Sequence, residues 1–158
     1  MDKIDKKILE VLQNDGKMNN QTLADKVALS PSPCLRRVKQ LEEEGYISKY
    51  VAILNPEKIG LQLTIIVLVE LSSHDPKIMA RFEGVIKSLP EVVQCYLIAG
   101  QEQDYMLKVV VPNLGEYQSF LLKKLTQIDG VRSVHSSFVL SNVVNKTSLP
   151  LNHLLSKN

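Results

Sequence analysis

The chain has 158 residues, of which 44% are hydrophobic and 23% charged, and its net charge is only +2. This balance is typical of a globular protein of one ordinary or two small domains, and it excludes a disordered chain or one that is basic throughout. Residues 1–7 are too polar for a secretory signal and the longest apolar run, 63–69, is too short to span a bilayer, so a cytoplasmic protein without a membrane partner is predicted.

Residues 1–45 have the periodicity of three short helices. Ile4, Ile8 and Leu12 recur every four residues, which places them on one face of the first helix. A second helix is predicted with Asn20 as its N-cap, and a tight turn joins it to the third. Two helices joined in this way, with another packed against them, are typical of a helix-turn-helix DNA-binding domain, here winged-helix-like.

The third helix concentrates the basic residues. Ser32 and Pro33 suit its N-cap and first position, and Leu35, Val38 and Leu41 are predicted to point inward. The remaining side is basic and should face solvent. N-terminal residues of the second helix of a helix-turn-helix reach base edges in the major groove of double-stranded DNA. The predicted DNA-binding residues are Ser30, Ser32, Pro33, Arg36, Arg37, Lys39 and Gln40.

Different side chains in this set suit different contacts with DNA. Arg36 can fork onto guanine, Gln40 onto adenine, and Ser32 can bond to either base. Arg37 and Lys39 are predicted to hold phosphates. The alternative is a three-helix bundle whose basic face is merely solvated, as a cluster of three charges often is.

Residues 46–60 are predicted to be a strand-bearing linker, because 47–54 have an extended pattern that leads into the turn at Asn55-Pro56. Residues 61–142 then alternate between strands and helices, and residues 143–158 form a C-terminal tail. Strands are predicted over 63–71, 92–99, 105–111 and 131–142, with helices that start at Asp75-Pro76 and at Pro112-Asn113.

The order of these elements predicts an α+β protein whose second domain is a ferredoxin-like βαββαβ unit. Both of its helices cover one face of an antiparallel sheet. The other face is rich in valine, isoleucine and leucine and has no cover within the chain. An apolar face of that size should be buried by another subunit, so at least a homodimer is predicted.

Residues that could carry chemistry are few. Cys34 and Cys95 lie far apart without CxxC spacing, which favours a reduced compartment, and Cys34 is predicted to be buried. His74, His135 and His153 are isolated in sequence. We therefore predict no catalytic residue, no metal site and no cofactor.

The loop after the second predicted strand has features of a binding site. Gly100 permits a positive φ, and Asp104 offers a carboxylate at the mouth of an intersubunit cleft. The alternative is a β-turn with a solvated aspartate.

The sequence resembles the leucine-responsive/asparagine-responsive (Lrp/AsnC) family of transcription regulators over nearly its whole length. The matching stretches are 5–9, 23–30, 33–42, 54–56, Gly100 with Asp104-Tyr105, and Gly130-Val131. The tail at 147–155 resembles leucine- and methionine-responsive members. The resemblance implies dimers built through the C-terminal sheets, assembly into octamers, and an amino-acid effector between dimers.

The resemblance also implies where the effector binds. The predicted residues are Ile98, Gly100, Gln101, Glu102, Gln103, Asp104, Tyr105, Met106 and Ser136, and the predicted effector is leucine or methionine. Two positions depart from the family pattern. The loop between Gly100 and Asp104 has three residues where the family usually has two, and Val134 replaces a frequent hydroxyl residue.

Two other functions remain open at this point. One is a nucleoid-organising DNA-binding protein without any effector. The other is an enzyme, since some tetrapyrrole decarboxylases resemble this two-part fold, and fold alone does not define function.

Overall fold

The computed structural model describes residues 1–100 and 102–155. It divides into two compact units, one formed by Met1–Ile53 with Val143–Asn158 and the other by Leu54–Asn142. No helix within the described residues is long and apolar enough to cross a membrane.

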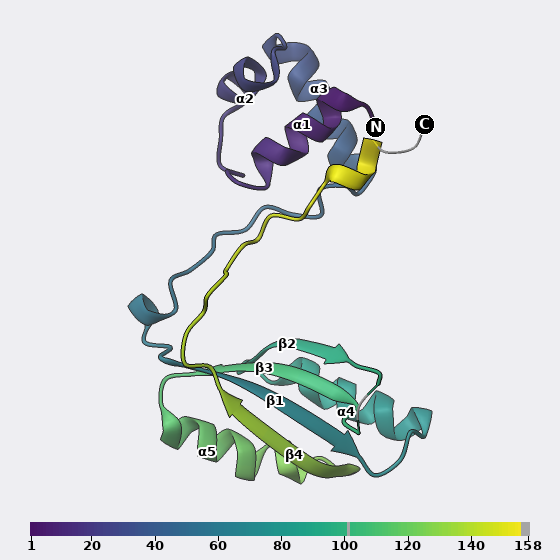
Figure 1. The fold of residues 1–158 in the computed structure, drawn as a ribbon, viewed down its shortest axis with the longest axis vertical. Helices are drawn as coiled ribbons and strands as arrows, with labels where there is room; N and C mark the ends of the chain where they lie inside the picture. Colours follow the sequence, from purple (N-terminus) through teal and green to yellow (C-terminus); the bar gives the residue numbers. More distant parts are fainter. Residues whose placement is uncertain (101, 156–158) are drawn as a thin grey trace. The chain divides into compact units, whose positions relative to one another are not determined.

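The first unit contains helices α1 (Lys3–Leu12), α2 (Asn20–Val27) and α3 (Pro31–Glu43) (Figure 1). Asp2 caps α1 through a capping box with Asp5, and Asn19, rather than the predicted Asn20, caps α2. Helix α3 starts two residues earlier than predicted, with Ser30 as N-cap and Pro31 in its first turn. The three helices enclose a small core of Ile8, Leu12, Leu23, Ala24, Val27, Cys34 and Leu41.

The inner face of α3 differs from the prediction at one position. Cys34 is completely buried, whereas Leu35 is 44% exposed. Leu35 and Leu41 are six residues apart, which places them about 120° apart around a helix, so both cannot face the centre of one core. Cys34 and Leu41 are separated by only about 20°. The inward stripe is therefore Cys34, Val38 and Leu41.

The turn between α2 and α3 is held by backbone and side-chain bonds. Ala28 adopts a left-handed conformation with φ of 57°, and the next amide, that of Leu29, donates to the Ala24 carbonyl at 2.9 Å. The side-chain amide of Asn20 donates to the Pro31 carbonyl at 2.8 Å. These bonds fix the direction in which α3 leaves the turn.

The predicted strand at 47–54 is not formed, and no wing strand occurs in the described part of this unit. Residues 46–53 instead line a groove together with the end of α1 and residues of the tail. The side chain of Gln13 donates to the Leu149 carbonyl at 3.1 Å and accepts from the Leu149 amide at 2.9 Å. The described part of the tail, which includes the short helix η3 (Asn152–Leu155), is thus part of the first unit.

The second unit is the predicted α+β fold. Its sheet contains β1 (Leu63–Leu71), β2 (Val92–Leu97), β3 (Tyr105–Val111) and β4 (Val131–Phe138), in the antiparallel order β2-β3-β1-β4. Helices α4 (Pro76–Ser88) and α5 (Leu114–Lys123) connect these strands, with short helices η1 (Glu57–Ile59) and η2 (Leu125–Gln127) before β1 and after α5. Strands β2 and β4 end earlier than predicted.

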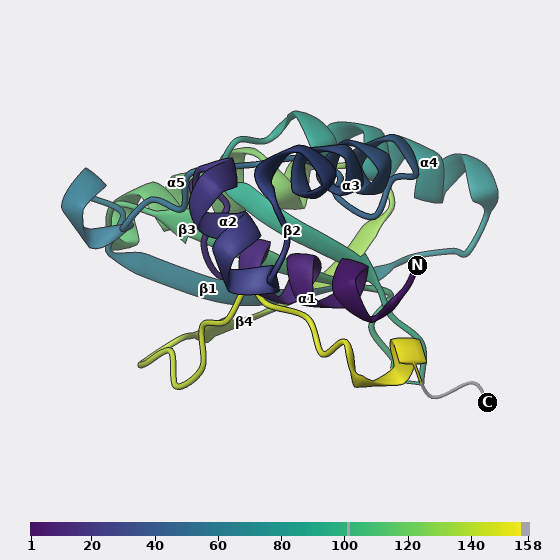
Figure 2. The same ribbon diagram turned by 90° about the horizontal axis from the view of Figure 1, so that it is seen from above.

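Both long helices lie on one face of this sheet (Figure 1 and Figure 2). From Ile65 on, every second residue of β1 points toward them and is buried, as is every second residue of β3. Phe82 and Ile86 of α4 and Tyr117 and Phe120 of α5 are buried in the same core. The alternate residues of β1 and β3 on the other face include Ile66, Leu68, Met106 and Val110, which are only partly buried. The exposed Tyr96 of β2 lies opposite Met106, and no described element of this unit covers this face.

Candidate functional site

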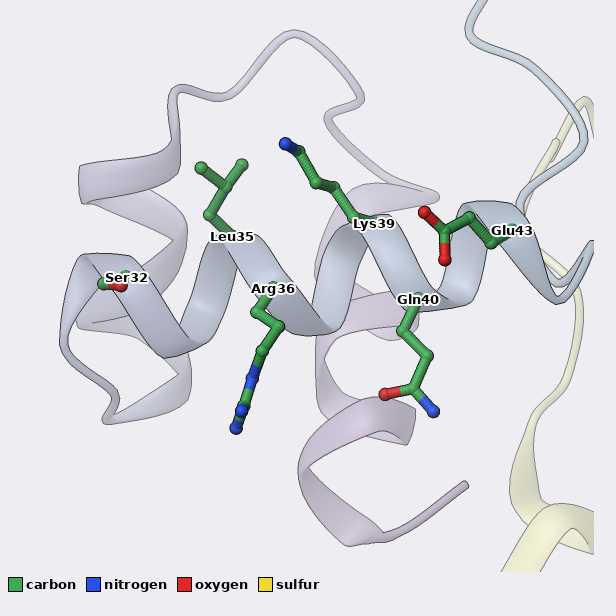
Figure 3. A pocket seen from close by; sticks show the side chains of 6 residues that line it. All are labelled: Ser32, Leu35, Arg36, Lys39, Gln40 and Glu43. Carbon is green, nitrogen blue, oxygen red and sulfur yellow. The ribbon is translucent and has the colours of Figure 1, made fainter.

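The exposed side of α3 forms a shallow groove-like surface. Its lining residues are Ser32, Leu35, Arg36, Lys39, Gln40 and Glu43. They form two adjacent rows along the helix (Figure 3). Leu35 and Lys39 project to one side, while Arg36 and Gln40 project to the other. The two rows arise because residues four apart in a helix lie nearly above one another.

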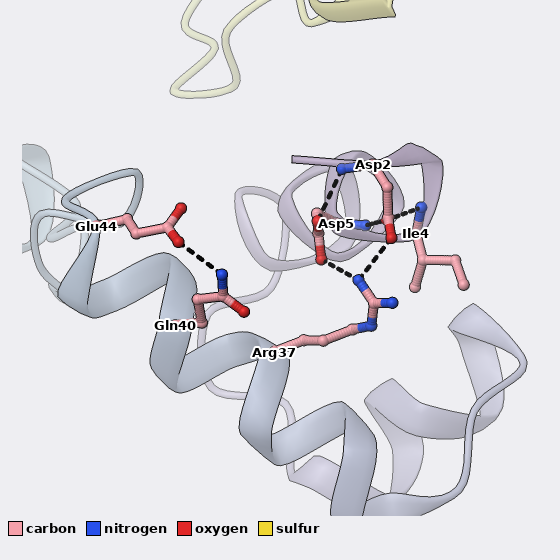
Figure 4. A network of polar contacts seen from close by, with 6 residues as sticks. All are labelled: Asp2, Ile4, Asp5, Arg37, Gln40 and Glu44. Atoms are coloured by element: carbon pink, nitrogen blue, oxygen red, sulfur yellow. Dashed lines mark hydrogen bonds and ion pairs between the residues drawn. The ribbon is translucent and has the colours of Figure 1, made fainter.

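This α3 face carries two basic side chains, Arg36 and Lys39, and one acidic side chain, Glu43. Arg36 and Lys39 form no ion pair with any residue in the described ranges, and both are exposed. Gln40 donates from its side-chain amide to Glu44 at 2.6 Å (Figure 4). Such a surface can bind a polyanion through Arg36 and Lys39 while Ser32 and Gln40 supply hydrogen bonds.

The start of α3 adds a further polar group to the same end of the surface. The Ser30 side chain makes no capping bond, and Pro31 and Pro33 have no N–H. The Ser32 amide is therefore the donor that the first turn of α3 presents, at the positive end of the helix dipole. The predicted residues Ser30, Ser32 and Pro33 are thus placed together around the helix start.

Arg37 faces α1 rather than the exposed surface of α3. Its Nη1 atom donates to Asp2 at 2.8 Å and to Asp5 at 2.6 Å (Figure 4). These hydrogen bonds raise the pKa of the Arg37 guanidinium, with Asp5 contributing most. The Asp5 amide in turn lowers the pKa of Asp2. For the predicted phosphate contact, Arg37 would have to use N–H groups other than those on Nη1, or this network would have to open.

Among the predicted effector residues, Asp104 is anchored inside the second unit. Its carboxylate accepts from the Leu71 amide at 2.7 Å and bonds to Nε2 of His74 at 2.6 Å. Its backbone amide donates to Val69 and its carbonyl accepts from Ile98. Asp104 is 9% exposed, so it is not the solvated turn residue of the alternative interpretation. It closes the loop from β2 to β3.

The other predicted effector residues lie on different surfaces. Tyr105 is buried against Phe82 and donates to Glu83 at 2.9 Å, whereas Met106 points to the opposite, uncovered face. Ser136 shares a hydrogen bond with the hydroxyl of Tyr117. Gly100 has the expected positive φ, of 96°. Glu102 is exposed and Gln103 half-buried, and Gln101 lies outside the described residues.

One subunit does not bring these residues into one pocket. Ser136 is on the edge strand β4, and the loop around Gly100 connects the two strands on the other side of β1. Two strand spacings, about 10 Å, separate β4 from β3. An effector that contacts both regions therefore needs residues from a second copy of the chain.

Sequence reasoning did not identify three residues that contribute to these surfaces. Leu35 was assigned to the core, although its six-residue separation from Leu41 indicates an outward position. His74 and Tyr117 hold Asp104 and Ser136, but each lies about twenty or thirty residues from its partner, and no local pattern connects them.

Known proteins resemble the chain in both units. Residues 1–48 match the family described as winged helix-turn-helix DNA-binding, and residues 64–149 match the Lrp/AsnC ligand binding domain. The chain is 43% identical to the Bkd operon transcriptional regulator of Pseudomonas aeruginosa over 151 residues, which are 96% of this chain and 98% of that protein. It is 36% identical to the leucine-responsive regulatory protein of Escherichia coli strain K12 over 149 residues, or 94% and 90% of the two chains.

A solved structure resembles the chain over nearly its whole length. The transcriptional regulator NMB0573 of Neisseria meningitidis, crystallised as a complex with L-Met, superposes with a TM-score of 0.94. The two sequences are 41% identical, and the match covers 98% of this chain and 99% of that one.

Proposed function

Because the chain belongs to the Lrp/AsnC family of DNA-binding transcription regulators, we propose that it recognises an operator in double-stranded DNA through the exposed face of α3. The observation that carries this proposal is the exposed cluster of Ser32, Arg36, Lys39 and Gln40, whose two cations have no ion-pair partner in the described ranges. The protein then acts in the cytoplasm as a regulator rather than as an enzyme.

Separate roles for Arg36 and Lys39 can be tested by gel shifts at several salt concentrations. Arg36→Ala removes a base contact and should cost about 1–3 kcal/mol while it relaxes sequence preference. Lys39→Ala should weaken binding to all sequences and reduce the salt slope by about one unit. Lys123→Ala, an equal loss of charge on α5, is the control. Wild-type affinity in both α3 variants would contradict the proposal.

We further propose that the uncovered sheet face pairs two copies of the chain, and that dimers assemble further into an octamer. Support comes from the apolar side chains of Ile66, Leu68 and Met106 on a face that neither α4 nor α5 covers. A symmetric dimer also suits a palindromic operator with half-sites about 10 base pairs apart. Light scattering at micromolar concentration should give a mass of at least two chains, and a monomer that binds its operator tightly would refute the pairing.

We propose that a free amino acid, leucine or methionine, binds between subunits near the loop at Gly100 and Ser136. The relatives named for leucine and for an L-Met complex support this choice. Because the Asp104 carboxylate is bonded to Leu71 and His74, an effector ammonium can reach it only if the exposed His74 side chain moves away. Loop amides and the Ser136 hydroxyl supply the remaining polar groups.

Calorimetry with leucine, methionine, asparagine and lysine tests the effector. Apolar amino acids should bind best, since polar side chains would be buried without partners. Ser136→Ala should weaken binding, whereas Ser137→Ala should not, because Ser137 points to the opposite face of β4. The proposed site is wrong if no amino acid binds or if the two serine variants behave alike.

A further inference from the structure

Leu35 is an apolar side chain in the middle of a polar, basic surface. It is 44% exposed, whereas Cys34, beside it in the sequence, fills the core position. In Figure 3, Leu35 projects away from the helix in the row that continues with Lys39, level with Arg36 of the adjacent row. Ser32, Arg36, Lys39, Gln40 and Glu43 are the polar residues that line the same surface.

The neighbours of Leu35 restrict what this side chain can contact. Arg36 and Lys39 attract a polyanion, so the surface in front of Leu35 becomes the floor or wall of a DNA groove when the protein is bound. A leucine cannot form a hydrogen bond with a phosphate or with a polar base edge. If Leu35 were placed against either group, it would displace water from that group without replacing the lost hydrogen bond.

The major groove offers one apolar group that suits Leu35. This group is the C5-methyl of thymine, which distinguishes an A·T pair from all others by shape and not by hydrogen bonding. We propose that Leu35 is a specificity-determining residue that packs on a thymine methyl next to the base read by Arg36. The inference rests on the function proposed above and assigns the recognition of one further base to Leu35.

The proposal predicts a penalty when one methyl group is removed from the DNA. Burial of one methyl-sized group corresponds to about a fourfold change in affinity. After an operator is selected from a random pool by the full-length protein, each thymine is replaced singly by uracil, which keeps every hydrogen-bonding group. The wild type should lose about fourfold in affinity at one thymine per half-site.

Protein variants assign this penalty to Leu35. Leu35→Ala should bind the thymine and uracil operators equally at that position. Lys39→Ala, in the same row of α3, should bind both operators more weakly and keep the fourfold difference. Since Leu35 lies on the surface, circular dichroism should show an intact fold for Leu35→Ala.

The outcomes separate this inference from the proposed function. If the pool yields no preferred sequence, sequence-specific recognition fails and the role of Leu35 fails with it. If an operator is selected but no uracil substitution weakens wild-type binding, the role of Leu35 alone is overturned. The same conclusion follows if Leu35→Ala retains the penalty at the same thymine.

Discussion

Gly130 stands at the turn that leads into β4, and its replacement by alanine should destabilise the second unit. Its φ of +94° is one that side-chain-bearing residues rarely adopt. A Cβ atom at this position would lie 2.5 Å from Cγ2 of Ile78 in α4. Gly130→Ala therefore has two separate free-energy costs, one from the left-handed backbone and one from the close contact with Ile78.

The size of the effect follows from these two costs. A left-handed backbone costs about 1–2 kcal/mol for a residue with a side chain. A carbon–carbon approach of 2.5 Å, about 1 Å below an ordinary contact, requires side chains to shift as in an overpacked core, at about 1–3 kcal/mol. The reduced freedom of the unfolded chain offsets about 0.4–1 kcal/mol. We expect a net loss of about 2–4 kcal/mol, or about 10–25 °C in the melting temperature of this unit.

Two other glycines provide controls for scanning calorimetry. Gly100→Ala has the same backbone strain, with φ of +96°, but no atom within 4 Å of the new Cβ. Gly84→Ala in α4 has neither cost and should be neutral or stabilising by up to about 1 kcal/mol. Ile78→Ala combined with Gly130→Ala should cost less than the two single changes together. Equal losses of stability for Gly100→Ala and Gly130→Ala would show that the contact with Ile78 does not destabilise the protein.

Four further outcomes can be measured. Ala28→Gly should stabilise the helical unit by about 0.5–1 kcal/mol in thermal unfolding, because glycine relieves the left-handed turn; a lower melting temperature would contradict this. Arg37→Ala should lower the melting temperature of that unit and leave the salt slope of DNA binding unchanged, whereas a reduced slope would identify a phosphate contact. Leu68→Arg should shift light scattering toward monomers, while Arg81→Ala on α4 should not. Burial and the Glu83 hydrogen bond raise the pKa of Tyr105, so the neutral phenol contributes its full stabilisation below pH 10 and this contribution is lost as the pH rises further. In urea unfolding above pH 10, Tyr105→Phe should therefore lose less of its free energy of unfolding than the wild type does.

The strands at the centre of the sheet could be predicted from the sequence with correct bounds. In β1 and β3, alternate residues are buried, and turn-forming residues flank each of these two apolar segments. The segment at 47–54 has an equally extended pattern, but no strand in the described chain pairs with it. A pattern of alternation cannot supply the partner that a strand requires.

The beginning of α3 shows a different limit of local sequence. Ser30-Pro31 and Ser32-Pro33 are both suitable pairs of N-cap and first helical residue, and the structure uses the earlier pair. The choice depends on tertiary contacts such as the bond from Asn20 to the Pro31 carbonyl. The ion pairs of Arg37 with Asp2 and Asp5 also join residues more than thirty positions apart, and the pattern of charges along the chain gave no sign of them.

The bonds between Gln13 and Leu149 have a consequence for the order in which the protein matures during synthesis. They join residues 136 positions apart, and the whole second unit lies between them in the chain. Domains fold as units while the chain is still being made. Residue 149 is made after the whole of residues 54–142, so the surface around α1 cannot be completed until the second unit has been synthesised. The helical unit therefore gains its bonds to Leu149 later than any contact made within residues 54–142 can begin to form.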